Sequence, residues 1–136
     1  MLRRRLPGLT MLAVLPFLAG CDLTAQQMPP SHPYFVFFAP DSAALDGTGR
    51  TIVADAAAYA KVYPLAPVAV TGYGDPAVGA ADAARMARLR ADALVKELTA
   101  DGVDARRIAV RPPAVGADVA SSQAARRGDI IVGLLP

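Results

Sequence analysis

The sequence offers few residues that could carry covalent or metal chemistry. It holds one cysteine, Cys21, and one histidine, His32, and both lie in the first quarter of the chain. No serine, histidine and aspartate set, metal-binding cluster or glycine-rich phosphate loop stands out in the remainder. We therefore expect no enzyme, no metal site and no cofactor, which leaves one thiol and the charged side chains as candidates for function.

Cys21 follows a short apolar segment that is typical of a secretion signal. Arg3–Arg5 supply a positive start, and Leu6–Gly20 is shorter than the ~20 apolar residues that span a membrane. The end of this segment, Leu18-Ala19-Gly20-Cys21, resembles a lipobox, the signal for diacylglycerol transfer to the cysteine and cleavage before it. The sequence thus predicts a signal peptide at residues 1–20 and lipidation (diacylglycerol and palmitate) of Cys21. The alternatives are a buried free cysteine and an uncleaved membrane anchor.

Removal of the signal peptide changes the charge of the chain. The full sequence has 14 basic and 12 acidic residues. Residues 1–20 contain three of the arginines and no acid, so the mature chain would carry 11 basic and 12 acidic side chains, a net charge near −1. A basic domain is the usual footprint of nucleic-acid binding, and this class of partner is not expected.

The mature chain divides by composition into a tether and one folded domain. Residues 21–33 combine the lipidated cysteine with a segment rich in glutamine and proline, which includes His32 and reaches roughly 40 Å when extended. Residues 34–136 show the patterns of a folded domain. We expect strands at 34–38, 68–71, 107–110 and 130–134, a helix from Asp46 to Tyr63-Pro64, and a helix at 80–100. The order β-α-β-α-β-β predicts an α+β two-layer sandwich with the helices on one face of a mixed four-stranded sheet.

Several motifs in this order match a known family. Asp41–Leu45 is similar to its opening Ser-x-x-Leu turn, and Gly72-Tyr73-Gly74-Asp75 stands where the family usually has Gly-His-Thr-Asp. Met86–Ala91 matches Leu-Ser-x-x-Arg-Ala, and Arg126-Arg127 precedes the last strand as in the family. Residues 35–135 therefore resemble the OmpA-like peptidoglycan-binding domain, in the tethered form of a peptidoglycan-associated lipoprotein.

The resemblance implies non-covalent binding of the peptidoglycan stem peptide. Diaminopimelate in such a peptide carries an ammonium and a carboxylate on one stereocentre. By resemblance, Asp75 would accept from the ammonium, Arg90 would grip the carboxylate as a planar fork, and Arg126 is a further candidate contact. A helical wheel independently places Arg90 at the flank of the apolar stripe, where its head could face a pocket.

Simpler interpretations of the same residues remain open. Asp75 before a proline is typical of a turn, and Arg90 could be a solvated helix residue paired with Glu97. Arg126 could likewise be a solvated charge, and Arg85 and Arg88 are expected on the exposed face of the helix. The family pattern is also incomplete. Four polar residues that are usual in the family are replaced here by Tyr73, Gly74, Ala83 and Ala125. Arg111-Pro112-Pro113 stands in place of a Gly-Tyr-Gly.

Two functions follow from these observations. The first is a lipid-anchored envelope protein that tethers a membrane to peptidoglycan. The second is a degenerate OmpA-like scaffold in an envelope protein assembly that no longer binds the wall. The resemblance implies the outer membrane, with the domain in the periplasm. Asp22 directly after the cysteine favours the inner membrane in the best-studied lipoprotein sorting systems and keeps that alternative open.

Overall fold

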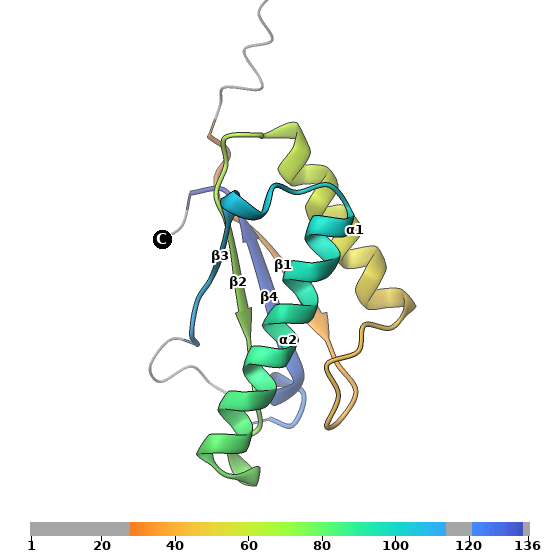
Figure 1. The fold of residues 1–136 in the computed structure, drawn as a ribbon, viewed down its shortest axis with the longest axis vertical. Coiled ribbons are helices and arrows are strands. Elements are labelled where there is room, and N and C mark those ends of the chain that lie inside the picture. Colours follow the sequence, from red (N-terminus) through yellow and green to blue (C-terminus); the bar gives the residue numbers. More distant parts are fainter. Residues whose placement is uncertain (1–27, 114–120, 135–136) are drawn as a thin grey trace, which may run out of the picture.

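The computed structural model describes residues 28–113 and 121–134, in which two long helices cover one face of a four-stranded sheet (Figure 1). This confirms the predicted α+β two-layer class. The elements in chain order are β1 (His32–Phe37), α1 (Gly47–Val62), β2 (Val68–Gly72), α2 (Ala80–Ala100), β3 (Ile108–Val110) and β4 (Arg127–Val132), with short 3-10 helices η2 (Pro76–Val78), η3 (Ala105–Arg107) and η4 (Ala124–Arg126).

The sheet is mixed, with strand order β1-β4-β2-β3. Strand β4 runs antiparallel to both β1 and β2, whereas β3 pairs with β2 in parallel. The carboxyl ends of β1, β2 and β3 therefore meet the amino end of β4 at one end of the sheet, which is the lower end in Figure 1. Loops from distant parts of the sequence converge there, which is a common place for a binding site.

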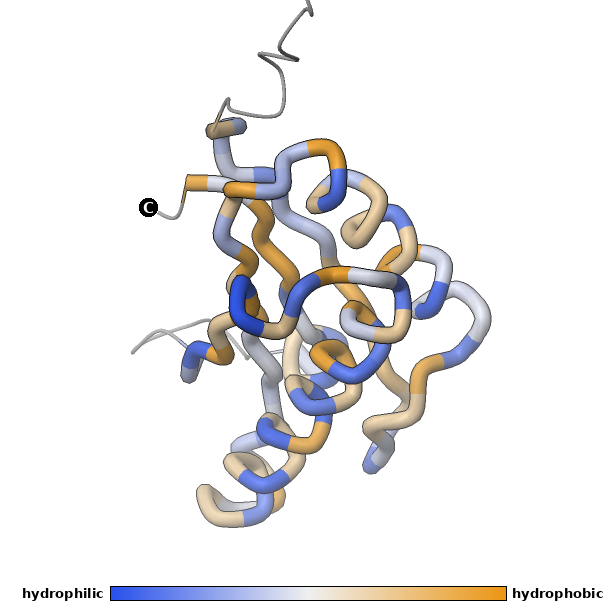
Figure 2. The backbone as a smooth tube through the Cα atoms, turned by 45° about the horizontal axis from the view of Figure 1, so that its top comes forward, coloured by the Kyte–Doolittle hydropathy of each residue, from blue (hydrophilic) through white to orange (hydrophobic). Residues whose placement is uncertain are grey.

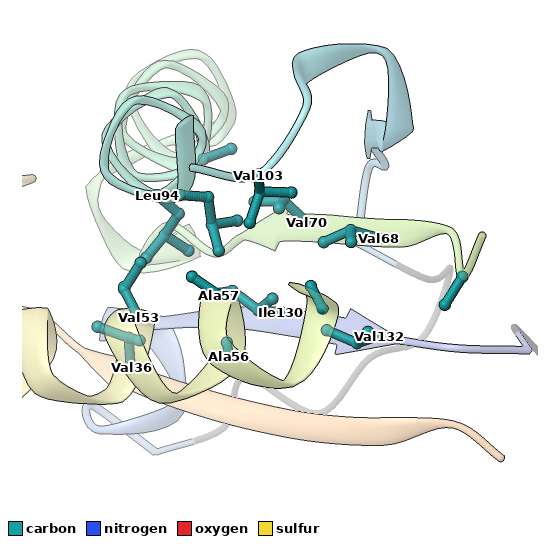
Figure 3. Close-up of a cluster of buried hydrophobic side chains, with 14 of the residues drawn as sticks. Val36, Val53, Ala56, Ala57, Val68, Val70, Leu94, Val103, Ile130 and Val132 are labelled. Atoms are coloured by element: carbon teal, nitrogen blue, oxygen red, sulfur yellow. The ribbon is translucent and has the colours of Figure 1, made fainter. Parts of the chain in front are cut away.

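The core lies between the helices and the sheet. Figure 3 shows Val53, Ala56 and Ala57 of α1 and Leu94 of α2 gathered with valines and Ile130 of the strands. Alanines on the inner face of α1 let its backbone approach the sheet closely. Each fully buried valine, leucine or isoleucine stabilises the fold by ~1.5–3 kcal/mol. In Figure 2 the helices alternate between hydrophobic and hydrophilic residues, as expected for helices that cover only one face of a sheet.

Specific polar contacts define both ends of α1. As predicted, Asp46 caps its start, and the Asp46 carboxylate accepts a hydrogen bond from the Gly49 N–H at 2.7 Å. At its end, the Arg107 guanidinium donates to the carbonyls of Ala60 and Tyr63 at 2.9 and 2.8 Å. Burial lowers the pKa of Arg107. A cation at these carbonyls favours the helix terminus and ties α1 to the start of β3.

Two strands, β1 and β4, begin two or more residues earlier than the sequence predicts. Strand β1 begins at His32, because His32 and Pro33 pair with Val132 and Ile131 of β4. The predicted tether therefore ends at least two residues too late, and a proline is tolerated there because β1 is an edge strand. His32 also packs on Tyr59, with ring centroids 4.9 Å apart. The predicted signal peptide, Cys21 and the rest of the tether to residue 27 lie outside the described residues.

Strand β4 begins at Arg127, three residues before the apolar run that predicted it. Arg127 and Asp129 lie on the sheet face that the helices do not cover, where Arg127 Nε is 2.8 Å from Asp129 Oδ1 and its guanidinium stacks on the Tyr73 ring at 4.5 Å. The Tyr73 hydroxyl donates to the other Asp129 oxygen at 3.0 Å. Both residues were expected to precede the last strand, and their mutual pairing explains why they fit within it.

Candidate ligand-binding cleft

A cleft of about 470 Å³ opens at the lower end of the sheet. Its walls come from the segment after β1, the segment after β2, the first turns of α2 and the turn before β4. The three sequence-predicted ligand residues, Asp75, Arg90 and Arg126, all line it. The remaining lining residues are Pro40, Asp41, Val78, Asp82, Arg85, Met86 and Ser122. Three aspartates thus face three arginines, so the cleft carries both charges and almost no net charge.

Asp75 holds the turn that leads from β2 into the cleft wall. One of its carboxylate oxygens, Oδ1, accepts a hydrogen bond from the Ala77 N–H at 2.9 Å and caps η2. Pro76 follows as the first residue of that 3-10 helix, where its missing N–H costs nothing. The turn interpretation of Asp75 is therefore correct. It is compatible with ligand binding, because the side chain is half-buried and still lines the cleft.

Arg90 is almost completely buried, with 2% of its surface exposed. Its Nε–H donates to the Ser42 carbonyl at 2.9 Å, and Nη1 donates to the Tyr73 and Ala125 carbonyls, both at 2.7 Å. Nη2 makes a longer contact of 3.5 Å with the Ala39 carbonyl. The interpretation of Arg90 as a solvated residue is therefore wrong.

These contacts also limit what Arg90 can offer a ligand. A guanidinium has five N–H groups, and four are directed at backbone carbonyls, so one N–H on Nη2 is left for the cleft. The expected two-pronged grip on a carboxylate would require Arg90 to release a carbonyl. What Arg90 supplies in this arrangement is a fixed, buried positive charge with one donor.

Burial and neighbouring charges both act on the pKa of Arg90. Burial lowers the pKa of its guanidinium, the positive charge of Arg126 lowers it further, and the Asp41 carboxylate acts in the opposite direction. An arginine remains protonated under such conditions. Among the described residues no carboxylate lies within salt-bridge distance of Arg90. Carbonyl dipoles and the Phe38 ring, whose centroid is 5.4 Å from the guanidinium carbon, stabilise the charge, and an anion in the cleft would be favoured.

Arg126 is better placed than Arg90 to bind a planar anion. Its Nε–H donates to the Ser122 carbonyl at 3.0 Å, which fixes the direction of the side chain. Within the described part of the chain neither of its terminal nitrogens has a hydrogen-bond partner, and the residue is half-buried at the cleft wall. The rim opposite carries Arg85, whose Nε is 3.7 Å from Asp82 in an exposed pair. Arg85 is thus exposed, as expected, but it also lines the cleft.

Two glycines bring α2 onto the end of β2. A Cβ atom built on Gly72 would lie 1.9 Å from the Ala87 carbonyl oxygen, and one on Gly74 would lie 1.9 Å from that of Ala83. Only glycine allows such close approach of two backbones. The glycine at position 74 and the alanine at position 83 thus form one tight contact. This contact sets the place of Arg90 relative to Asp75.

The matching family model covers residues 37–127, more than half of the chain, and is that of the OmpA family. The chain belongs to the OmpA family. The curated protein sequences contain no match to it.

Solved structures give the same fold. The OmpA-like domain of FopA1 from Francisella tularensis has a TM-score of 0.65 and 20% identity, with 75% of this chain and 71% of that chain covered. The peptidoglycan-associated lipoprotein from Burkholderia pseudomallei has a TM-score of 0.62 and 24% identity, covering 73% and 89%. The cell wall anchor of the T6SS from Pseudomonas aeruginosa has a TM-score of 0.59 and 20% identity, covering 84% and 92%.

The OmpA cleft of this protein contains residues that the sequence did not single out. Asp41 has φ = 50°, a left-handed conformation that is uncommon for a residue other than glycine, and its position at the cleft follows from that turn. Asp82 and Met86 belong to the first turns of α2 that face the cleft. The Pro40-Asp41-Ser42 turn after β1 was the available signal. Within residues 28–113 and 121–134 no group of three potential metal-binding side chains and no helix suited to crossing a membrane is found.

Proposed function

We propose that this protein is a lipid-anchored envelope protein whose OmpA domain binds peptidoglycan non-covalently through its stem peptide. The observation that carries the proposal is the cleft at the lower end of the sheet, in which Asp75 lies with Arg90 and Arg126. A ligand that carries an ammonium and a carboxylate on one carbon needs an anion and a cation in fixed positions. Diaminopimelate in a stem peptide has this chemistry.

The contacts of each side chain suggest which group of the ligand it binds. Asp75 uses Oδ1 to cap η2, and in the described residues Oδ2 has no donor, so Oδ2 is the acceptor for the ligand ammonium. Arg126 offers two terminal nitrogens and is the fork for the ligand carboxylate. Arg90 adds a buried positive charge and one N–H beside that carboxylate. No bond is made or broken, so the protein acts as a binding module and not as an enzyme.

The membrane part of the proposal depends on Cys21. Acylation of this residue would anchor the chain, and the domain would bind the wall from the periplasmic side. The outer membrane is the proposed location, with the inner membrane as the alternative because of Asp22. Two similar structures point the same way, since one is a peptidoglycan-associated lipoprotein and the other is a cell wall anchor.

The competing function is a scaffold that no longer binds peptidoglycan and instead binds an envelope protein. The engagement of four Arg90 donors by backbone carbonyls favours this alternative, because a ligand carboxylate would find only one of them free. Gly74 also removes the hydroxyl that the family pattern has next to the aspartate. The engaged Arg90 donors and the missing hydroxyl at position 74 would both weaken binding of the stem peptide without affecting the fold.

A sedimentation experiment with peptidoglycan sacculi separates the two functions. Purified residues 22–136 should sediment with sacculi. Asp75→Asn keeps an oxygen that can accept from Ala77 but removes the charge, and Arg126→Gln removes the fork. Each should weaken binding by roughly tenfold or more, as expected for loss of a hydrogen bond to a charged group. Arg88→Gln, on the exposed face of α2, is the matched control and should bind like the wild type.

The possible failures have distinct meanings. Sedimentation of the wild type, Asp75→Asn and Arg126→Gln to the same extent would exclude this cleft as the wall-binding site. No sedimentation of the wild type would favour the scaffold function. Circular dichroism of each variant must show an unchanged fold for the comparison to count.

A further inference from the structure

Exposed apolar side chains gather at the upper end of the sheet, opposite the cleft. Met28 is 42% exposed, Val62 54%, Leu65 64% and Leu134 57%. They come from the residues before β1, from the end of α1 and the connection to β2, and from the end of β4. Together they form what we call the apolar end of the domain.

Hydrogen bonds hold these separate segments together. The Gly133 N–H donates to the Pro67 carbonyl at 3.0 Å, and the Leu134 N–H donates to the Pro29 carbonyl at 3.2 Å. Gly133 has φ = 113°, and a side chain there would collide with the carbonyl of Pro30. Figure 1 shows the three segments meeting at this end of the sheet. These hydrogen bonds make the apolar end a defined part of the fold.

Tyrosines lie beside the apolar end. Tyr63 stacks against Tyr59 with centroids 5.0 Å apart, and Tyr59 lies 6.5 Å from Tyr34, all three half-buried. A tyrosine with an apolar body and a wet hydroxyl is characteristic of the interface between lipid and water. An apolar patch bordered by tyrosines fits the headgroup region of a bilayer better than it fits bulk water.

The charges at this end do not oppose a lipid surface. Asp104 is paired with Arg106 at 2.6 Å, and Lys61 donates to the Asp101 carbonyl at 3.0 Å. Arg107 adds one more positive charge. Asp55, whose charge acts on the bordering Tyr34, balances Arg107. Among the described residues these six charged side chains therefore sum to no net charge, so they do not repel a surface that contains anionic phospholipid.

The short chain between Cys21 and Met28 limits how far the apolar end can lie from a membrane that holds Cys21. If Cys21 is acylated, as the proposed function requires, it sits at the membrane surface. The chain from Cys21 to Met28 can span at most roughly 25 Å, which is its length at full extension. The described domain starts at the apolar end, so this end is kept within that distance of the bilayer. We infer that the apolar end docks on the lipid surface next to the anchor, and that the cleft consequently points away from the membrane.

Site-specific fluorescence can test this docking in the full-length lipidated protein. Acylation leaves Cys21 without a thiol, so one introduced cysteine is the only labelling site. Leu65→Cys and Leu134→Cys place an environment-sensitive fluorophore at the apolar end. Val78→Cys is the matched control, because Val78 is a 52% exposed apolar residue at the cleft. The proteins are reconstituted into vesicles of phosphatidylethanolamine and phosphatidylglycerol that contain a lipid with a nitroxide quencher.

The expected result is several-fold stronger quenching at positions 65 and 134 than at position 78. Equal, weak quenching at all three positions in protein that floats with the vesicles would overturn the docking and leave the anchor intact. Failure of the wild type to float would overturn both the anchor and the docking. A signal at position 65 that disappears when the protein is diluted within the membrane would assign the apolar end to a second copy of the chain instead.

Discussion

Arg90 joins parts of the chain that are far apart in the sequence. Its guanidinium contacts the carbonyl of Ser42 after β1, that of Tyr73 after β2 and that of Ala125 before β4. These are three of the segments that form the cleft. A single side chain therefore assembles the cleft walls and also contributes charge to the cleft, so loss of Arg90 combines a structural effect with a binding effect.

The structural effect can be measured without ligand. Arg90→Lys keeps the positive charge but replaces a planar group with five donors by a compact ammonium with three. Carbonyls of the cleft walls would be left without donors. We expect the free energy of unfolding to fall by about 2–4 kcal/mol. Arg88→Lys, two residues away on the exposed face, should change it by less than about 0.5 kcal/mol. Urea denaturation of both variants checks this, and equal stability would show that the carbonyl contacts contribute nothing.

The sequence predicted the identity of the cleft residues better than their contacts. Asp75, Arg90 and Arg126 were found through family motifs, and the helical wheel located Arg90 at the flank of the core. Its contacts with carbonyls could not be predicted, because they depend on where three loops end in space. Nothing in residue spacing indicates that Asp41 adopts a left-handed conformation beside them.

At the level of elements, α2 and β2 approach more closely than side chains normally allow. Gly72 and Gly74 face the backbone of α2, while Tyr73 between them packs under Arg127 on the opposite face of the sheet. The alternation explains the Gly-Tyr-Gly sequence. The threonine usual at position 74 in the family would collide with Ala83 in this protein, so its replacement by glycine is a requirement of packing.

A pair of glycine substitutions tests this packing. Gly74→Ala should lower the free energy of unfolding by about 2–3 kcal/mol, because its Cβ would meet the Ala83 carbonyl and push α2 away. Gly47→Ala is the control. Gly47 is in the first turn of α1 with nothing within 4 Å of its Cβ position, so alanine there should stabilise by roughly 0.5 kcal/mol. Thermal unfolding measures both, and a neutral Gly74→Ala would show that α2 can move freely.

The elements themselves were largely predictable from periodicity. Both helices show an apolar stripe, and Asp46 caps α1 as its position suggests. The early starts of β1 and β4 have a common cause. His32, Pro33, Arg127 and Asp129 lack strand-forming character on their own and are extended because β1 and β4 pair with each other. Pairing between strands so distant in the sequence leaves no local signal.

At the scale of the whole molecule, the two ends of the sheet differ in chemistry. The lower end carries a charged cleft, and the upper end carries apolar side chains and leads back toward Cys21. A domain with this polarity faces the wall when its chain start is held at a membrane. With the proposed anchor, the arrangement would work from either membrane, since both membranes face the peptidoglycan.

The residue that bears on this choice is Asp22. We expect the full-length protein in the outer-membrane fraction, and Asp22→Ser should stay there, because the proposed location does not depend on the aspartate. Gln26→Ser, a polar change in the same segment, is the control. Density-gradient separation of the two membranes measures the distribution. If the wild type sediments with the inner membrane and Asp22→Ser moves to the outer membrane, Asp22 is a retention signal. The cleft would then bind the wall from the cytoplasmic-membrane side, with the same orientation relative to its anchor.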